Sequence, residues 1–259
     1  MYQSKNDRAQ TVQFLLFHPV VHMVIYPLSF ILFGIIMGSR INMFRLTEVI
    51  ALFLYVLTFY LLDLITKRTK SIYSFIRTLQ GIIGTLVFIT LSFYLGQINS
   101  IYFMLIMCLN GLFLFGKEWY QKIHPFNHVY VTWIRAIYYG LIFNGMALYT
   151  LGHVILFSKL GLMLPLVLLH WVYLKVRPHA VSNDGLLKTF KAMPYLIVIL
   201  GILIKFISVY SLPFIIALLG LSVFGQKKLL PDDSLVSQRV FISYEILVLS
   251  FIVGVSAII

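Results

Sequence analysis

The chain has 259 residues, of which 61% are hydrophobic and only 11% are charged. This composition leaves too little polar surface to cover a soluble globular protein. The formal net charge of +12 would suggest nucleic-acid binding in a soluble domain, but here the basic residues flank apolar runs that are long enough to cross a bilayer. We therefore expect an integral membrane protein whose partners are membrane lipids and not nucleic acid.

Nine apolar runs follow one another along the chain without a low-complexity linker between them. A bilayer core of about 30 Å needs about 20 apolar residues per helix, so each run is a candidate membrane span. The first run, Phe14 to Met37, is longer than the core of a signal peptide and lacks a clear cleavage site, so we expect a retained helix. The prediction is an all-α, polytopic membrane helical bundle in one domain, 1–259, with spans near 14–38, 46–66, 73–95, 98–116, 129–150, 154–174, 193–206, 209–224 and 240–258.

The positive charges gather on every second connection between these runs. If the N-terminus is cytoplasmic and nine spans follow, sixteen of the twenty Lys and Arg residues lie on inner connections or nearby helix ends. Treating 193–224 as a single helix would move Lys227, Lys228 and Arg239 outside, against the positive-inside rule. The charges favour about nine transmembrane helices, with the N-terminus in and the C-terminus out, in a multi-pass protein of the cell membrane. The four basic residues then left outside are Arg40, Arg45, Lys159 and Lys205.

Two of the eight acidic residues have suggestive positions on the predicted inner side, one at the end of the second span and one in the loop after the sixth. Asp63 is a candidate site residue because a carboxylate near the membrane is costly unless it has a cationic partner. Its alternative role is a local ion pair with Lys67, four residues further along the same helix. Asp184 lies in the turn sequence Ser182-Asn183-Asp184-Gly185, where a structural role as a helix cap is the alternative to a site role.

The nine spans, the N-in topology and the polar loops after spans two and six resemble the UbiA superfamily of intramembrane prenyltransferases. In that family each of the two loops carries an Asp-rich motif. Here Asp63 is followed by Arg68-Thr69-Lys70, and Asp184 by Gly185 and Lys188-Thr189. The resemblance implies that Mg²⁺, held at Asp63 and Asp184, binds an isoprenoid diphosphate while apolar helices enclose its tail. The substrate-binding residues that it implies are Asp63, Arg68, Asp184 and Lys188, with Lys175 and Arg177 adding positive charge.

Both motifs are eroded in this chain. Each loop keeps one Asp of its motif, and Lys67 stands where a second Asp is expected after Asp63. Basic residues in place of carboxylates lower the affinity for a divalent ion, although they can bind phosphate directly. We therefore expect a cytoplasmic-side cavity that binds an isoprenoid or lipid-like phosphate, with prenyl transfer weakened, altered or lost and no catalytic residue assigned. The alternative is a non-enzymatic transporter or accessory membrane protein.

Short segments also resemble the YwiC-like bacterial membrane proteins, a family of similar length. The similar positions are His18 ahead of Pro27 and Gly34, Lys117-Glu118 followed by Asn127, and the run from Tyr173 to Arg177. They are spread over most of the chain. This resemblance implies a bacterial membrane protein and no particular activity.

The remaining candidates are histidines and one basic loop. His18 and His22 are four residues apart on one helix face, a spacing that can bind a metal or haem, with His170 as a possible facing ligand. Histidines that lie at the membrane interface or are hydrogen-bonded within the bundle are the favoured alternative. The loop before the fifth span, which follows Lys117, is expected to form an anion-binding or lipid-headgroup surface. Cys108 is expected to be a packing residue.

Overall fold

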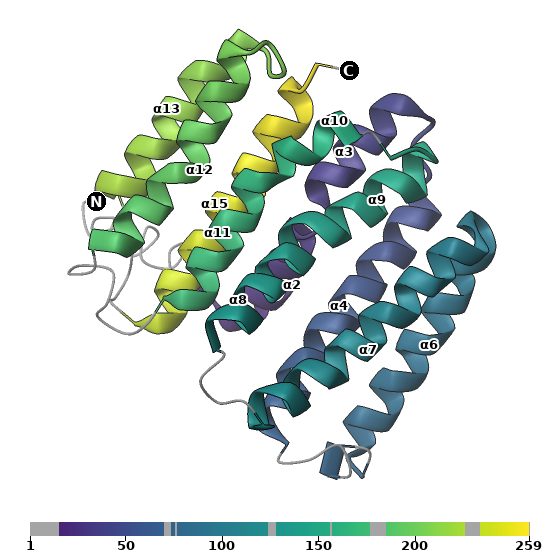
Figure 1. Cartoon of the computed structure of the whole chain (residues 1–259). Helices are drawn as coiled ribbons and strands as arrows, with labels where there is room; N and C mark the ends of the chain where they lie inside the picture. The colour runs from purple at the N-terminus through teal and green to yellow at the C-terminus, as the bar shows by residue number, and fades with distance from the viewer. Residues whose placement is uncertain are drawn as a thin grey trace, which may run out of the picture.

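The computed structural model describes residues 16–69, 74–75, 77–123, 128–155, 157–176, 185–225 and 234–258. Across these residues all regular secondary structure is helical, and the one extended pairing is an isolated bridge between Ile207 and Ala257. The predicted all-α class is therefore confirmed. Figure 1 shows the chain as a bundle of elongated helices.

Helices lie over each of the nine predicted ranges. The seventh begins at Gly185 rather than near residue 193, because the helix continues through Lys188 and Lys191 and accommodates Pro194. The fifth is continuous but contains a π-helical turn. The α-helices are α2 (Pro19–Ser29), α3 (Leu32–Ile41), α4 (Leu46–Arg68), α6 (Leu79–Asn99), α7 (Ile101–Ile123), α8 (His128–Ile137), α9 (Phe143–Gly152), α10 (Phe157–Leu160), α11 (Leu164–Lys175), α12 (Gly185–Leu203), α13 (Leu212–Gly220) and α15 (Leu235–Ser256). The π-helical turns are η2 (Tyr138–Ile142) and η5 (Leu221–Gly225), and the 3₁₀ turns are η3 (Gly161–Met163) and η4 (Val209–Ser211).

Several helices are long and apolar enough to cross a membrane. Within the described residues three meet this requirement alone, namely α4, α6 and α15. The pair α2 and α3 meets it together across a 44° bend. Shorter apolar helical stretches cover 101–117, 161–175, 189–203 and 209–223. The helices are thus compatible with a membrane protein.

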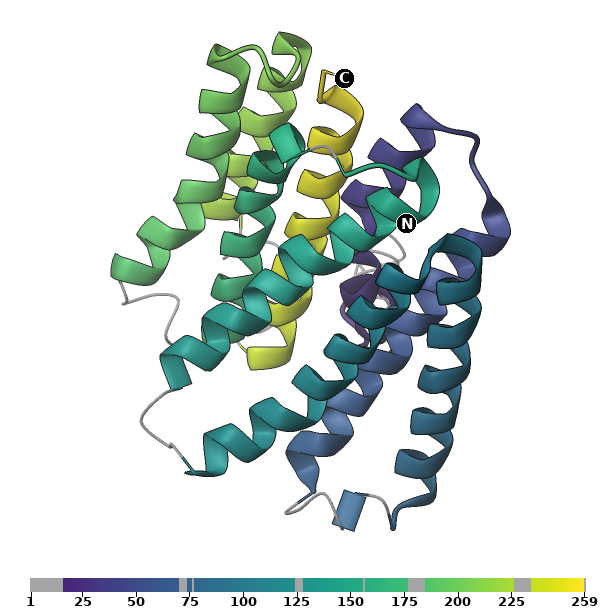
Figure 2. The ribbon, with the colours of Figure 1, turned by 45° about the vertical axis from the view of Figure 1, so that its right-hand side comes forward.

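The helices pack in a consistent order across the bundle. Figures 1 and 2 both show α4, α6 and α7 on one flank and α12 and α13 on the other, with α2, α3, α9, α11 and α15 between them. Large apolar side chains on the flanks face outward, as expected for a surface in contact with lipid: Leu86 is 60% exposed on α6 and Phe214 is 64% exposed on α13.

Two glycines bring α3 unusually close to α9. A Cβ atom on Gly34 would lie 2.0 Å from the backbone oxygen of Asn144, and one on Gly38 would lie 2.8 Å from the Cβ of Leu151. The Gly34 amide also donates to the Asn144 side-chain oxygen at 3.1 Å. Small residues four apart allow such close packing of membrane helices. The Gly34–Gly38 spacing therefore fixes the contact between the first and fifth predicted spans.

The bundle has two chemically different ends. One end, which we call the basic end, is formed by the last turns of α4, α7 and α11 and the first turns of α6, α8, α12 and α15. The opposite end, which we call the far end, holds the α3–α4, α6–α7 and α9–α10 connections, η4 and the last turn of α15. The four basic residues that the sequence assigned to the outer side lie at the far end: Arg40, Arg45, Lys159 and Lys205.

Candidate functional site

Asp63 lies near the last turn of α4, at the basic end, and is fully buried. Its Oδ2 atom is 2.6 Å from Lys67 Nζ, one helical turn further on. Its Oδ1 atom forms an ion pair with Lys117 Nζ from α7. The hydroxyl of Tyr139, in the π-helical turn η2, donates to Oδ2 at 3.1 Å. One carboxylate therefore joins three segments that are distant in the sequence.

The environment of Lys117 explains why this ion pair is held tightly. Lys117 is only 5% exposed, and its ammonium lies 5.6 Å from the Phe59 ring centre and 5.3 Å from that of Phe113. Aromatic faces attract a cation, but a buried ammonium still needs a hydrogen-bonded anion to offset its lost hydration. With Lys67 on the same carboxylate, the three groups together carry one net positive charge.

Aromatic rings extend from Asp63 toward α2 and α11. Tyr26 is 1% exposed, and its ring stacks on Tyr173 with centres 3.8 Å apart. The same ring is 5.5 Å from Tyr60, 6.1 Å from Tyr139 and 5.6 Å from His170. Since Tyr139 also bonds Asp63, the rings and the ion pair form one continuous cluster.

A cationic group borders the rings on the side of α15. The Arg239 guanidinium lies 5.7 Å from the Tyr173 ring centre. The Tyr173 hydroxyl is hydrogen-bonded to His22 Nε2 at 2.8 Å, and His22 Nδ1 is 3.3 Å from the Ser243 hydroxyl. We call the whole set the basic–aromatic cluster: His22, Tyr26, Tyr60, Asp63, Lys67, Lys117, Tyr139, His170, Tyr173 and Arg239.

Several buried polar atoms of this cluster have no hydrogen-bond partner among the described residues. They are the Tyr26 hydroxyl, both ring nitrogens of His170 and Arg239 Nε. His170 is fully buried against the rings of Tyr26, Phe30 and Tyr139. Buried polar groups in folded proteins nearly always have a partner, so unpartnered ones need an explanation. The described residues supply no such partner for these four atoms.

The predicted site residues fall into three groups. Asp63 lies inside the cluster. Arg68 is exposed at the end of α4, and Lys175 is partly buried at the end of α11. The remaining predictions lie outside what the structure describes: Arg177 and Asp184 entirely, and the side chain of Lys188 on α12. The predicted meeting of Asp63 with Asp184 therefore stays a prediction.

The donor set at Asp63 does not fit Mg²⁺. Both oxygens of this carboxylate bind lysine ammonium groups, and Mg²⁺ prefers several oxygen ligands, including waters, in octahedral geometry. No group of three or more His, Cys, Asp or Glu side chains that could hold a metal occurs in the described ranges. The arrangement at Asp63 therefore gives no support for a bound Mg²⁺.

The two histidines of the first span, His18 and His22, both form hydrogen bonds within the protein. His18 caps α2 by accepting a hydrogen bond from the Val20 amide at 3.3 Å, and His22 binds Tyr173 and Ser243 as above. Both thus have hydrogen-bonding roles, which was the favoured alternative to metal or haem binding. The prediction for Cys108 is wrong, since this residue is exposed on α7.

A second buried ion pair lies beside the cluster. Lys191 Nζ is 3.4 Å from Glu245 Oε1, and both side chains are at most 8% exposed. The same ammonium donates at 3.1 Å to the backbone oxygen of Ser222, in the π-helical turn η5. The wider turn leaves this oxygen available to a side chain. The pair joins α12, η5 and α15 at the flank of the bundle.

Sequence reasoning missed most of the cluster. Arg239 was recognised only as an inner-side charge, and Lys117 only as such a charge, as part of the YwiC-like match and as the start of a basic loop. Tyr26 and Tyr139 were not recognised at all. In a chain with sixteen Tyr and twenty-two Phe, single tyrosines carry little signal. The sequence feature that could have indicated Tyr26 and Tyr139 is a hydroxyl group in the middle of an otherwise apolar run.

No protein-family model matches this sequence, and neither a curated protein nor a solved structure matches it.

Proposed function

We propose that the chain crosses the cell membrane nine times, with the N-terminus in, the basic end in the cytoplasm and the C-terminus out. The support is the partition of charge between the two ends. Three far-end cations serve internal contacts: Arg45 pairs with the buried Glu48, while Arg40 and Lys159 donate to backbone oxygens at the end of α15. Basic residues that make such internal contacts say little about which side of the membrane they lie on. The charges left to obey the positive-inside rule are therefore nearly all at the basic end.

The two glutamines of α6 allow a matched test of this topology. Gln80 and Gln97 are exposed near opposite ends of the same helix. In a Cys108→Ser background, we expect Gln97→Cys to react with a membrane-impermeant maleimide on intact cells. Gln80→Cys should react only after permeabilisation. The reverse pattern would refute the proposed orientation, and equal labelling of both before permeabilisation would refute a span at α6.

We further propose that the basic–aromatic cluster binds the phosphate or diphosphate head of an isoprenoid or lipid-like molecule. The observation that carries the proposal is the composition of the cluster, which among the described residues contains one carboxylate and the three cations Lys67, Lys117 and Arg239. The surplus of positive charge favours an anion, and Arg239, which has no ion pair among the described residues, can bind phosphate oxygens with its planar fork. In this mode the basic side chains bind the phosphate themselves, without a bridging metal ion.

The aromatic walls suit the first isoprene units of such a ligand. The rings of Tyr26, Tyr60 and Tyr173 are buried against one another, so in this proposal the first isoprene unit packs against their edge. The Tyr26 hydroxyl and the His170 ring nitrogens are the polar atoms of these rings without a partner among the described residues. A UbiA-like or YwiC-like bundle would hold the tail between its apolar helices. This architecture is part of the proposal.

The neutralised carboxylate bears on whether the protein is an enzyme. In UbiA-like prenyl transfer, Asp-bound Mg²⁺ would draw charge from the leaving diphosphate. Asp63 is instead engaged by two lysines, which favours binding without metal-assisted prenyl transfer. The same observation favours the alternative function, a non-enzymatic transporter or accessory membrane protein that handles the same phosphate-bearing molecule. If transfer does occur, the protein is a membrane prenyltransferase.

Binding of farnesyl diphosphate and farnesol to the purified full-length chain tests the proposal. We expect the diphosphate to bind at least about tenfold more tightly, because one hydrogen bond to a charged group contributes about 1.5–3 kcal/mol. Arg239→Gln should weaken diphosphate binding about tenfold or more and leave farnesol binding unchanged. The matched control is Arg77→Gln, which removes an exposed charge from the same end. Equal affinities for farnesyl diphosphate and farnesol would refute the proposal. Equal effects of Arg239→Gln and Arg77→Gln on diphosphate binding would also refute it.

A further inference from the structure

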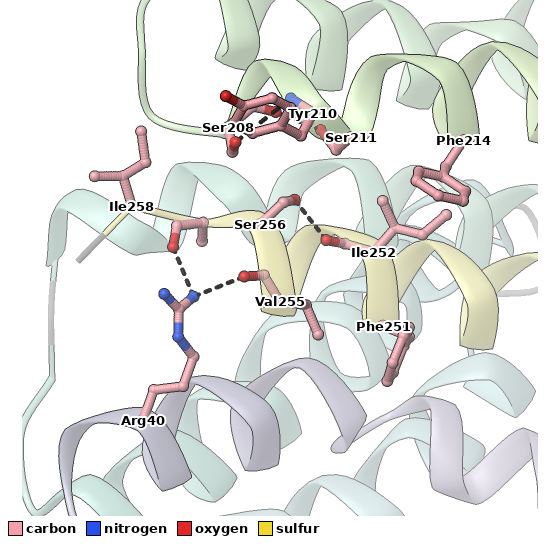
Figure 3. Close-up of a pocket in the computed structure, with 11 residues that line it drawn as sticks. Arg40, Ser208, Tyr210, Ser211, Phe214, Phe251, Ile252, Val255, Ser256 and Ile258 are labelled. Carbon is pink, nitrogen blue, oxygen red and sulfur yellow. Dashed lines mark hydrogen bonds between the residues drawn. The ribbon is translucent and has the colours of Figure 1, made fainter.

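A pocket of about 580 Å³ lies at the far end of the bundle, away from the basic–aromatic cluster. It is formed on one face of α15 between the last turn of α3 and the segment from η4 into α13. Figure 3 shows Arg40 at one side, Phe214 and Phe251 along the length of the pocket, and Ser208 and Tyr210 across from Arg40. The volume lies within the range of about 300–1,000 Å³ that is typical of ligand sites.

Two cations contact the helix end that borders this pocket. Arg40 Nη1 donates to the backbone oxygens of Gly254, Val255 and Ala257. Lys159 Nζ donates to the backbone oxygen of Ile258. A helix C-terminus carries only about half a negative charge, so these two cations already exceed it.

A third basic residue, Lys205, lies in a turn whose backbone is hydrogen-bonded to the end of α15. Lys205 has a positive φ of 62° in the turn before η4. This turn is bonded to the end of α15, with Ser208 donating to Ser256 at 2.8 Å and Ile258 donating to Phe206 at 3.0 Å. Three of the four far-end cations therefore belong to segments that meet at one helix end. Among the described residues the acidic side chain of this end is Glu48, and it is paired with Arg45.

The guanidinium of Arg40 keeps donors for a ligand. All its hydrogen bonds within the described residues are made by Nη1, and the residue is exposed. Nε and Nη2 are therefore available beside the pocket. The two serine hydroxyls on the opposite wall have internal partners, since Ser208 Oγ accepts from the Tyr210 amide and Ser211 Oγ donates to the Ser208 oxygen. The Arg40 guanidinium is therefore the main polar group that this pocket offers to a ligand.

The apolar part of the pocket opens on the flank that faces lipid. Phe214 is 64% exposed, Phe251 is 56% exposed and Val255 is 51% exposed. Tyr210, at the end of the bundle, is 85% exposed, and tyrosine is the residue expected at the level of lipid headgroups. A cation at headgroup depth above an apolar groove is complementary to an amphipathic anion.

We propose that this pocket is a binding site for one anionic phospholipid, whose phosphate is bound by Arg40 and whose acyl chain lies along Phe214 and Phe251. Lys159 and Lys205 add to the attraction of the headgroup. The site is separate from the basic–aromatic cluster and does not depend on the ligand proposed there. It requires only that the chain is embedded in a bilayer.

Native mass spectrometry of the full chain in a neutral detergent tests this site with two added lipids, phosphatidylglycerol and phosphatidylcholine. We expect one phosphatidylglycerol to be retained in preference to phosphatidylcholine. Arg40→Gln should weaken its retention about fivefold, because a basic residue near the headgroup contributes about 1 kcal/mol. Val255→Trp should also reduce retention by filling the groove without changing the charge. Arg77→Gln, at the basic end, is the matched control and should have no effect.

Equal retention of the two lipids, or retention that is unchanged in both Arg40→Gln and Val255→Trp, would overturn the site. Displacement of phosphatidylglycerol by an equal concentration of glycerol 3-phosphate would also overturn it, since the acyl chain would then contribute nothing. Binding of farnesyl diphosphate to Arg40→Gln should equal that of the wild type. This last result separates a failure at the far end from a failure at the basic end.

Discussion

Asp63→Ala is expected to lower the free energy of unfolding by about 3–5 kcal/mol, the cost of leaving a buried charge without its counter-ion. Lys117 is 5% exposed and would remain buried beside Lys67 without the carboxylate that now lies between them. Unfolding of the purified protein in mixed detergent micelles, followed by loss of helical circular dichroism, measures the change. A loss below about 1 kcal/mol would contradict the burial of this pair.

The double variant Asp63→Leu, Lys117→Met shows whether the loss comes from the unpaired charge. Replacing a buried ion pair by apolar groups of similar volume is often neutral, so the double variant should recover most of the stability lost in Asp63→Ala. Lys67→Gln is the control on the same carboxylate. Its side chain is 34% exposed, so its removal should cost well under about 1 kcal/mol. A double variant as unstable as the single one would mean that Asp63 serves the fold in another way.

Gly34→Ala is expected to lower the free energy of unfolding by about 1–3 kcal/mol or more, because its Cβ atom would overlap the backbone of α9. The nearest atom, the Asn144 oxygen at 2.0 Å, belongs to the main chain and cannot move aside as a flexible side chain could. The added methyl group would therefore force the two helices apart. The same micelle unfolding assay measures this loss.

Gly145→Ala is the matched control for this prediction. Gly145 is in α9, the partner helix, and a Cβ atom there would meet nothing within 4 Å. Alanine at an unconstrained helix position should leave stability unchanged or raise it by about 0.5–1 kcal/mol. Similar losses in Gly34→Ala and Gly145→Ala would show that the close contact between α3 and α9 does not govern stability.

The positions of the helices could be predicted because hydropathy is a local property of the sequence. A run of apolar residues long enough for a span identifies a helix without knowledge of its neighbours, and helices indeed lie over all nine ranges. The start of α12 was placed too late because Lys188 and Lys191 were taken as loop charges. Lys191 instead pairs inside the bundle with Glu245, 54 positions along the chain, and this partner gave no local signal.

The candidate site was only partly predictable for the same reason. Asp63 and Lys67 are one helical turn apart, so their ion pair could be named from the sequence as the alternative role of Asp63. Lys117 and Tyr139 reach the same carboxylate from α7 and η2, and their approach depends on how those helices pack. The close contact at Gly34 likewise depends on which face of α3 meets α9. Pairings between distant segments are set by packing, which a single sequence does not reveal.

The charges at the two ends have different chemical environments. At the basic end, Lys117 is buried among aromatic rings and shares Asp63 with Lys67. At the far end, Arg40 and Lys159 bind backbone oxygens at the end of one helix. Among the described residues, the positive charges at each end outnumber the acidic side chains. We infer that each end recognises a phosphate-bearing lipid by direct contact with basic side chains.

The most direct test of direct phosphate recognition at the basic end is the affinity for farnesyl diphosphate, measured by isothermal titration with either Mg²⁺ or EDTA. The account predicts the same affinity in both buffers for the wild type, and in both a loss of about tenfold or more in Arg239→Gln. Binding that requires Mg²⁺ and is indifferent to Arg239 would contradict it.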